Sequence, residues 1–258
     1  MRLLILGGTI EARALADQAQ QRYGPGLDVI TSLAGRTAQP IGQAGAVRSG
    51  GFGGASGLAD YLRHQSIDVV IDATHPFAAT MSAHACEACA EVQVPRLMVV
   101  RAPWQMRDGD NWIEVDDIAA AAAALPALKT VSAGRARVML TLGASALTYF
   151  GGLKGFWFLA RMIEAPADPL PLRHCRVIEG RGPFTVAGER ELLVRHRIDV
   201  LVSRQSGGAA TGAKIDAART LGLPVVMIKR PPLAPGPHAA TVEDALIWLD
   251  ETLSLVPS

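Results

Sequence analysis

The sequence predicts an α/β protein built from two Rossmann-like domains with mostly parallel sheets and a cleft between the domains. Short apolar runs alternate with Ala-rich helical patterns from the first residue, which is the signature of parallel strands covered by helices. The length of 258 residues allows two domains of about 100–150 residues each. A hydrophobic fraction of 49% with 5% aromatic residues suits a core of Ala, Val and Leu.

Composition excludes several classes of protein. The 25 basic residues barely exceed the 24 acidic ones, so the basic surplus of a nucleic-acid-binding protein is absent. No apolar run approaches the roughly 18–20 residues that span a bilayer, and we expect no membrane partner. Three cysteines, an odd number, argue against a disulfide framework and favour a reducing cytoplasm.

The N-terminal domain is expected to cover residues 1–104. It opens with an apolar run that stops at a pair of glycines, which predicts a buried first strand. Further short apolar runs predict strands, and the stretches with helical spacing between them predict helices. The expected strands are 2–6, 28–31, 68–71 and 96–100, and the expected helices are 11–21, 57–65 and 77–91.

A change in composition marks the expected domain boundary. The segment from Arg101 to Trp104 contains a proline and is followed by the polar stretch Asp108–Asn111, so the second domain is expected to cover residues 105–258. Strand and helix patterns then resume. The expected strands are 138–142, 156–160, 176–179, 199–203 and 225–228, and the expected helices are 117–125, a short one from 144, 184–196, 210–221 and 242–253.

A dense polar segment, DATHPFA at residues 72–78, follows the strand at 68–71. Open α/β sheets bind ligands at the carboxyl ends of their strands. We expect Pro76 to fix the start of the next helix and Asp72 either to orient His75 or to cap that helix. A turn does not need a carboxylate, a hydroxyl and an imidazole within four residues. We therefore predict that Thr74 contacts a bound molecule and that His75 has a catalytic or positioning role. A structural histidine is the alternative.

The segment GGTIEA, residues 7–12, lies where the first strand turns into the first helix. Gly7 and Gly8 would let the backbone approach a phosphate, and Thr9 opens a helix whose free N–H groups favour an anion. The dinucleotide fingerprint G-x-G-x-x-G is absent, however, and Glu11 would repel a phosphate. A tight turn capped by Thr9 is the alternative interpretation.

The segment SLAGRT, residues 32–37, follows the second strand. In Rossmann domains an acidic residue at this place binds the ribose 2′-hydroxyl, whereas an arginine accommodates a 2′-phosphate. Here the polar residues are Ser32, Arg36 and Thr37, with no carboxylate. This favours NADPH over NADH, with a solvated arginine in a loop as the alternative.

A third segment, residues 203–214, follows the strand at 199–203 and opens a helix. Its small residues, hydroxyl groups and lysine suit an anion, and the candidate contacts are Ser206, Gly207, Gly208, Thr211 and Lys214. The Walker A pattern is absent. The alternative is a capped turn with a surface lysine.

Two further features stay open or unassigned. The glycine-rich stretch 49–54 around Phe52 is either a lid over a ligand or a plain connecting loop. Cys86 and Cys89 have the C-x-x-C spacing but lie inside an Ala-rich helical pattern without a second pair. We therefore interpret them as buried small residues and expect no metal site.

Four motifs together, GGTIEA, SLAGRT, DATHPFA and SRQSGGAATGAKIDAA, occur in the order and spacing of precorrin-6A reductases, and the chain resembles that family over nearly its whole length. The resemblance implies NADPH-dependent reduction of one double bond of precorrin-6A, which gives precorrin-6B in cobalamin biosynthesis. Such a tetrapyrrole carries acetate and propionate groups, which Arg101 and Arg204 are expected to bind. The family often has lysine at the position of Arg204. Hand-over of the macrocycle to neighbouring pathway enzymes is a further expectation.

The resulting hypothesis places NADPH between the domains, held by the Gly7–Thr9 turn, the Ser32/Arg36 loop and the Ser206–Gly208 turn. Hydride transfer needs the nicotinamide to be held close to the acceptor carbon in a site without water. Three alternatives remain at this point: a cobalt-precorrin-6A reductase of the anaerobic route, a module that senses a dinucleotide without chemistry, and a nucleotide-sugar transferase. The last would need a metal-binding acidic pair, and none is evident.

Overall fold

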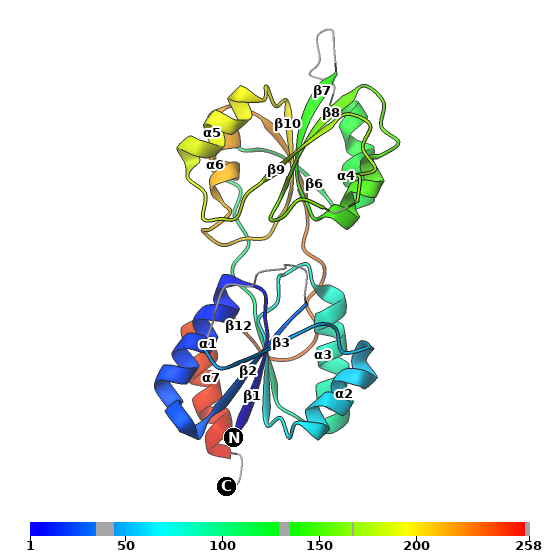
Figure 1. Ribbon diagram of the computed structural model, residues 1–258. Coiled ribbons are helices and arrows are strands. Elements are labelled where there is room, and N and C mark those ends of the chain that lie inside the picture. Colours follow the sequence, from blue (N-terminus) through cyan, green and yellow to red (C-terminus); the bar gives the residue numbers. More distant parts are fainter. Residues whose placement is uncertain (35–43, 129–134, 167, 256–258) are drawn as a thin grey trace. The chain divides into compact units, whose positions relative to one another are not determined.

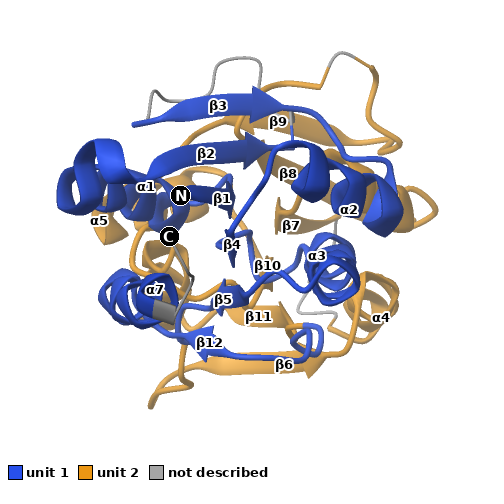
Figure 2. Ribbon diagram, turned by 90° about the horizontal axis from the view of Figure 1, so that it is seen from below, with its two compact units in different colours: residues 1–102, 231–258 blue, residues 103–230 orange. Residues whose placement is uncertain are grey.

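A computed structural model describes residues 1–34, 44–128, 135–166 and 168–255. The chain divides into two compact units, coloured separately in Figure 2: unit 1 comprises residues 1–102 and 231–258, and unit 2 comprises residues 103–230. Each unit contains a six-stranded parallel sheet, so the predicted α/β class with two Rossmann-like domains is confirmed. No helix among the described residues is long and apolar enough to cross a membrane.

The sheet of unit 1 has the strand order β12-β5-β4-β1-β2-β3, and every pair is parallel. Its chain runs outward from β1 to β3 and then returns to the other side of β1 with β4. A topological switch point therefore lies between β1 and β4, where such sheets bind ligands. The strands are β1 (Arg2–Leu6), β2 (Asp28–Leu33), β3 (Ala46–Ser49), β4 (Val69–Asp72), β5 (Arg96–Val99) and β12 (His238–Ala239).

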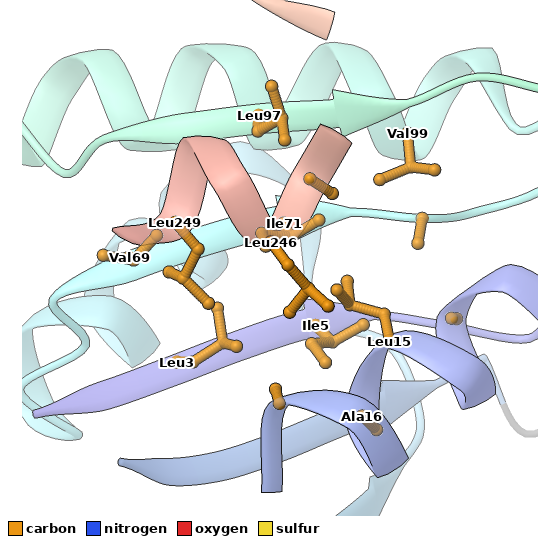
Figure 3. Close-up of a cluster of buried hydrophobic side chains, with 14 of the residues drawn as sticks. Leu3, Ile5, Leu15, Ala16, Val69, Ile71, Leu97, Val99, Leu246 and Leu249 are labelled. Carbon is orange, nitrogen blue, oxygen red and sulfur yellow. The ribbon is translucent and has the colours of Figure 1, made fainter. Parts of the chain in front are cut away.

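Helices cover both faces of this sheet (Figure 1), with α1 and α7 on one face and α2 and α3 on the other. The helices are α1 (Ile10–Tyr23), α2 (Gly54–His64), α3 (Ala79–Val92) and α7 (Val242–Leu255). Side chains of a strand alternate between faces. Leu3 and Ile5 accordingly pack toward α1 and α7 in the cluster of Figure 3, whereas Leu4 and Leu6 pack toward α2 and α3.

Unit 2 repeats the strand order of unit 1 with β7 in the central place of β1. Its order is β6-β11-β10-β7-β8-β9, again with every pair parallel. The strands are β6 (Asn111–Val115), β7 (Ala136–Thr141), β8 (Phe156–Met162), β9 (Cys175–Glu179), β10 (Val200–Arg204) and β11 (Pro224–Ile228). The α-helices are α4 (Ile118–Ala124), α5 (Val186–Arg195) and α6 (Ala213–Thr220). The segment after β7, Ala144–Phe150, is a 3₁₀ helix.

The division into units differs from the expected second domain of residues 105–258. Residues 231–258 pack on unit 1 because β12 pairs with β5 and because α7 buries Leu246 and Leu249 in the core beside α1. The sequence pattern gave no sign of this return. β12 has two residues, too few for a visible apolar run.

Several element boundaries also differ from the expected ones. β3 and β6 lie in stretches for which no strand was expected, because both are half-exposed edge strands that lack a continuous apolar run. α3 begins at Ala79 rather than 77, since the amide of Phe77 is bound by the His75 side chain and the amide of Ala78 by the His75 carbonyl. α6 begins at Ala213 rather than 210, after a turn of residues 209–212.

Candidate active site

The turn after β1 lies at the switch point of unit 1. The amide of Gly7 donates to the carbonyl of Ser32 at 2.8 Å, which binds this turn to the end of β2. A Cβ atom at Gly7 would come within 2.8 Å of Thr31 Cγ2, so the close approach of the two strands favours glycine. Gly8 has φ +106°, and the space where its Cβ would lie is open. This backbone is therefore accessible to a ligand.

Thr9 joins this turn to the one after β4. Its hydroxyl accepts a hydrogen bond from the amide of Ala12 at 3.1 Å, as the N-cap of α1. The same hydroxyl donates to the carbonyl of Ala73 at 2.7 Å. A single side chain thus fixes both strand ends at the switch point.

Glu11 in the first turn of α1 is paired with Arg101, which follows β5. Arg101 Nη1 lies 2.9 Å and 3.1 Å from the two carboxylate oxygens. The pair neutralises the acid that argued against an anion at this helix terminus. Arg101, expected as a substrate ligand, is therefore placed against Glu11 in unit 1, with 18% of its side chain exposed.

Asp72 ends β4 and is fully buried. Its Oδ1 accepts bonds from the Thr74 amide at 3.1 Å and the Thr74 hydroxyl at 2.7 Å. Ser82 of α3 lies 3.5 Å from the Thr74 hydroxyl. Asp72 was expected to orient His75 or to cap the next helix. Instead it holds Thr74, because α3 starts too far along the chain for Asp72 to cap it.

His75 is half-buried in the turn that Asp72 and Thr74 shape. Its Nδ1 accepts the Phe77 amide at 3.2 Å, and the two rings lie 5.9 Å apart. An accepting Nδ1 carries no hydrogen, so the neutral ring holds its proton on Nε2. The backbone of the turn therefore fixes the tautomer that His75 presents.

The carboxyl ends of β2 and β3 place Ser32 beside Arg48. Ser32 is buried, and its hydroxyl accepts a hydrogen bond from Arg48 Nη1 at 2.6 Å. Arg36 and Thr37, the other expected residues of this region, lie outside the described residues. Sequence reasoning missed Arg48. The signal that could have found it is the third parallel strand that a Rossmann half needs before α2.

The expected anion-binding turn of unit 2 follows β10 and is held by side chains around it. Arg230 donates to the carbonyls of Gln205 and Ser206, each at 2.8 Å, and Trp104 Nε1 donates to the carbonyl of Gly208 at 2.9 Å. Gly207 and Gly208 have φ of +68° and +78°, values that glycine adopts readily. The side chains of Arg230 and Trp104 thus hold the backbone of this turn in place.

Lys214 and Thr211 lie just beyond this turn. Lys214, in the first turn of α6, is buried with its ammonium group 5.3 Å from the centre of the Trp104 ring, and Thr211 is half-buried before the helix. The alternative interpretation, in which Lys214 is a surface lysine, is therefore wrong. Arg204 ends β10 in the same part of unit 2.

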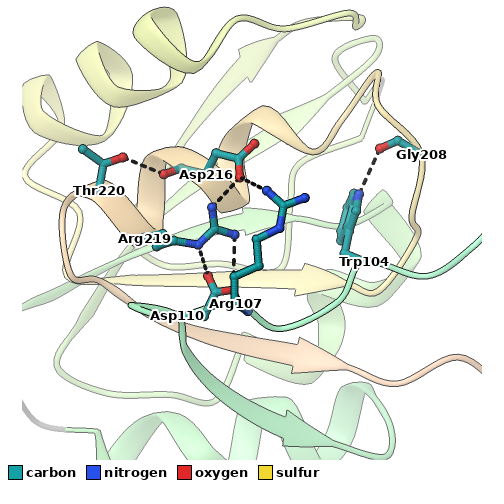
Figure 4. Close-up of polar contacts among 7 residues, drawn as sticks. All are labelled: Trp104, Arg107, Asp110, Gly208, Asp216, Arg219 and Thr220. Carbon is teal, nitrogen blue, oxygen red and sulfur yellow. Dashed lines mark hydrogen bonds and ion pairs between the residues drawn. The ribbon is translucent and has the colours of Figure 1, made fainter.

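Hydrogen bonds and ion pairs connect residues 107–110 to α6 (Figure 4). Arg219 donates to the almost fully buried carboxylate of Asp110 at 2.9 Å and to Asp216 at 2.6 Å. Arg107 lies 3.8 Å from Asp216. Just before these residues in the chain, Trp104 Nε1 donates to the Gly208 carbonyl.

Cys89 and Phe52, from two other features of the sequence, pack in or against the core of unit 1. Burial raises the pKa of the Cys89 thiol to about 12, as expected for a cysteine of the core. Among the described residues, no group of three His, Cys, Asp or Glu side chains could hold a metal ion. Phe52 of the glycine-rich stretch packs against the core beside α2.

Comparison with known proteins agrees with this architecture. A family model described as "Precorrin-6x reductase CbiJ/CobK" matches residues 2–250. The chain belongs to this family. A precorrin-6A reductase of Rhodococcus erythropolis is 46% identical over 251 residues, which cover 96% of this chain and 97% of that protein. A cobalt-precorrin-6A reductase of Priestia megaterium is 30% identical over 255 residues, covering 95% and 96%.

The fold of this precorrin-6x reductase family member also matches a solved structure. The protein "CobK precorrin-6A reductase" superposes with a TM-score of 0.88 at 43% identity, covering 97% of this chain and 96% of that one. The match runs through both units. The predicted family is therefore confirmed, and the assigned class of enzyme is oxidoreductase.

Proposed function

We propose that this member of the precorrin-6x reductase family reduces one double bond of precorrin-6A with NADPH, giving precorrin-6B in cobalamin biosynthesis. The main structural support for this proposal is the switch point of unit 1. There, the turn of Gly7, Gly8 and Thr9 meets the turn 72–78 at the carboxyl ends of β1 and β4. Relatives at 46% and 45% identity have the name precorrin-6A reductase, and the cobalt-precorrin-6A reductase of Priestia megaterium is at 30%. This difference favours the cobalt-free substrate.

The residues of unit 1 fit a reduced nicotinamide cofactor. Open space beside Gly8 would admit a pyrophosphate to the start of α1, and Arg101 offsets the charge of Glu11 there. At the described end of β2 the polar side chain is Ser32, with no carboxylate to select the 2′-hydroxyl of NADH. Arg36 and Thr37 stay candidates for the same end of the cofactor. When bound, NADPH supplies the hydride for the macrocycle.

His75 is proposed to position or protonate the reacting groups. Its neutral ring donates from Nε2, because Nδ1 is occupied by the Phe77 amide. Thr74, held by Asp72, would contact the cofactor from the same turn. In unit 2, Ser206–Gly208, Thr211, Lys214 and Arg204 are proposed to bind anionic groups of the cofactor or of the macrocycle.

The test of this proposal is an absorbance assay of NADPH oxidation with precorrin-6A, together with fluorescence titration of NADPH. The wild type should oxidise NADPH when precorrin-6A is added. His75→Ala should lower kcat about 10²–10⁴-fold if the ring transfers a proton, with a smaller change in NADPH affinity. His64→Ala, an exposed histidine of α2, is the matched control.

The other outcomes separate the alternatives. NADPH binding without any oxidation on addition of a tetrapyrrole would indicate a dinucleotide-sensing module instead of an enzyme. Turnover of the cobalt-containing macrocycle alone would indicate the anaerobic reductase. Equal losses of turnover and affinity in His75→Ala would reduce His75 to a binding residue.

A further inference from the structure

We propose that Arg48 is the residue that recognises the 2′-phosphate of NADPH, and that Ser32 shares this role. The inference rests on the proposed function, because it assigns one end of the same cofactor. Ser32 and Arg48 are aligned in the register of β2 and β3, at the carboxyl edge of unit 1. In Rossmann domains the ribose of the adenosine half lies at the end of the second strand.

Arg48 is held in place before any ligand arrives. Its guanidinium lies 3.9 Å from the centre of the Phe52 ring and 5.0 Å from that of Tyr61, and these two rings meet edge to face at 5.2 Å. Nη1 also donates to the Gly50 carbonyl at 3.2 Å, and Nη2 donates to the Gly51 carbonyl at 3.1 Å. Stacking and hydrogen bonds together fix the plane of the group, which lowers the entropy cost of binding.

The hydrogen-bond partners of Arg48 distinguish it from two other arginines near strand ends. Arg101 is paired with Glu11 and Arg161 with Glu189. Within the described ranges, no carboxylate lies at ion-pair distance from Arg48, and its hydrogen bonds go to the neutral oxygens of Ser32, Gly50 and Gly51. A half-buried cation that is positioned by neutral groups suits an incoming anion.

The donor geometry matches a phosphate. A guanidinium has five N–H donors, and the contacts to Ser32, Gly50 and Gly51 use three of them. Two remain for phosphate oxygens, a number that allows bidentate binding. Since the Ser32 hydroxyl accepts from Arg48, its own hydrogen can point to the same phosphate. The glycine-rich stretch 49–54 is therefore interpreted as the support of a binding arginine rather than as a lid.

The test compares two fragments that differ by the 2′-phosphate alone, 2′,5′-ADP and 5′-AMP. Calorimetry should show that the wild type binds 2′,5′-ADP more tightly than 5′-AMP. Arg48→Ala should weaken 2′,5′-ADP about 10–100-fold, the usual loss of a charge-assisted contact, and leave 5′-AMP unchanged. Arg48→Lys should fall between, because lysine keeps the charge without the planar fork.

Controls keep the outcomes distinct. Arg63→Ala removes an exposed arginine of α2 that pairs with Asp60 and Glu91, and it should change neither affinity. Thermal melts check that each variant is folded. If the alanine variant does not fold, Arg48→Lys still tests the inference, because it should weaken 2′,5′-ADP binding to a smaller extent and leave 5′-AMP unchanged. Arg36→Ala is measured in parallel, as the competing candidate.

Each result has one meaning for the inference. If the wild type prefers 2′,5′-ADP and Arg48→Ala keeps that preference, Arg48 is not the recognising residue, and the proposed function stands. Equal losses for both fragments in Arg48→Ala would assign Arg48 a structural role and would also overturn the inference. A wild type without any preference would refute NADPH itself, and with it the cofactor of the proposed function.

Discussion

The two units have the same strand order but differ at the carboxyl edges of their sheets. In unit 1 the central strand β1 leads through an open glycine turn into α1, which has 14 residues. In unit 2 the equivalent strand β7 leads into a 3₁₀ helix of 7 residues without a side-chain cap. Only an α-helix offers a sustained dipole and a set of free N–H groups at its start. In the described part of the chain, the central strand of unit 1 is therefore followed by the start of an α-helix, whereas the central strand of unit 2 is not.

Two arginines near strand ends, Arg48 in unit 1 and Arg161 in unit 2, also differ in their partners. Arg48 of unit 1 is bound by neutral oxygens, whereas Arg161 of unit 2 is buried against Glu189 in a two-point contact and lies over the Phe184 ring at 4.0 Å. Glu189 neutralises Arg161, and the pair joins β8 to α5. Arg48 stays available for a ligand. An arginine at a strand end is thus informative only together with its partners.

Breaking the pair in unit 2 should have the largest effect on stability. Glu189→Gln leaves Arg161 buried without its counter-charge, and such a loss costs about 3–5 kcal/mol. The double variant Arg161→Met with Glu189→Leu should recover most of this, because no charge is then left alone. Urea unfolding measures both.

The same variants also sharpen the comparison between the units. The ratio of NADPH to NADH affinity should be unchanged in the folded double variant, since the pair lies in unit 2. A changed ratio would show that Arg161 contributes to cofactor recognition, and the contrast with Arg48 would then fail.

Removing the cap of α1 should have an intermediate effect. Thr9→Val deletes the hydroxyl that caps α1 and donates to the Ala73 carbonyl, and loss of a cap costs about 0.5–2 kcal/mol. Thr9→Ser keeps the hydroxyl and is the matched control. Denaturant unfolding and NADPH titration should both show a loss in the valine variant alone.

The contrasting position in unit 2 is Gly143, which precedes the 3₁₀ helix and makes no side-chain cap. Gly143→Ala should therefore leave NADPH affinity unchanged. If Thr9→Val also binds NADPH normally, the turn of unit 1 is only a structural cap.

The sequence predicted the switch-point elements well because their strands are buried on both faces. Such strands, β1 and β4 among them, form continuous apolar runs that end at visible polar motifs. Edge strands such as β3 lack this pattern, so the sequence did not predict β3. Arg48 was missed for the same reason, because its proposed role depends on the register that places it beside Ser32. Pairing is the second limit. Glu11 and Arg101 form an ion pair but are 90 positions apart in the sequence, so no local pattern could show that the acid is neutralised.

Substitution of His196, which follows α5 in unit 2, should have the smallest effect on stability. Its ring stacks on Trp157 at 6.2 Å, and Arg137 lies over the same tryptophan at 3.7 Å. Burial lowers the pKa of His196, and the charges of Arg176, Arg137 and Arg195 lower it further. The folded protein therefore resists protonation that the unfolded chain accepts near pH 6.5.

The sign of the pH dependence follows from proton binding. Because the unfolded state binds the proton more readily, the free energy of unfolding falls as the pH drops below about 6.5 and levels off below the folded pKa. His196→Gln should remove this part of the acid sensitivity, so that its stability relative to the wild type improves from pH 7.5 to pH 5. His64→Gln is the control and should keep the wild-type slope. Parallel profiles for wild type and His196→Gln would show that burial and the three arginines do not lower the pKa of His196.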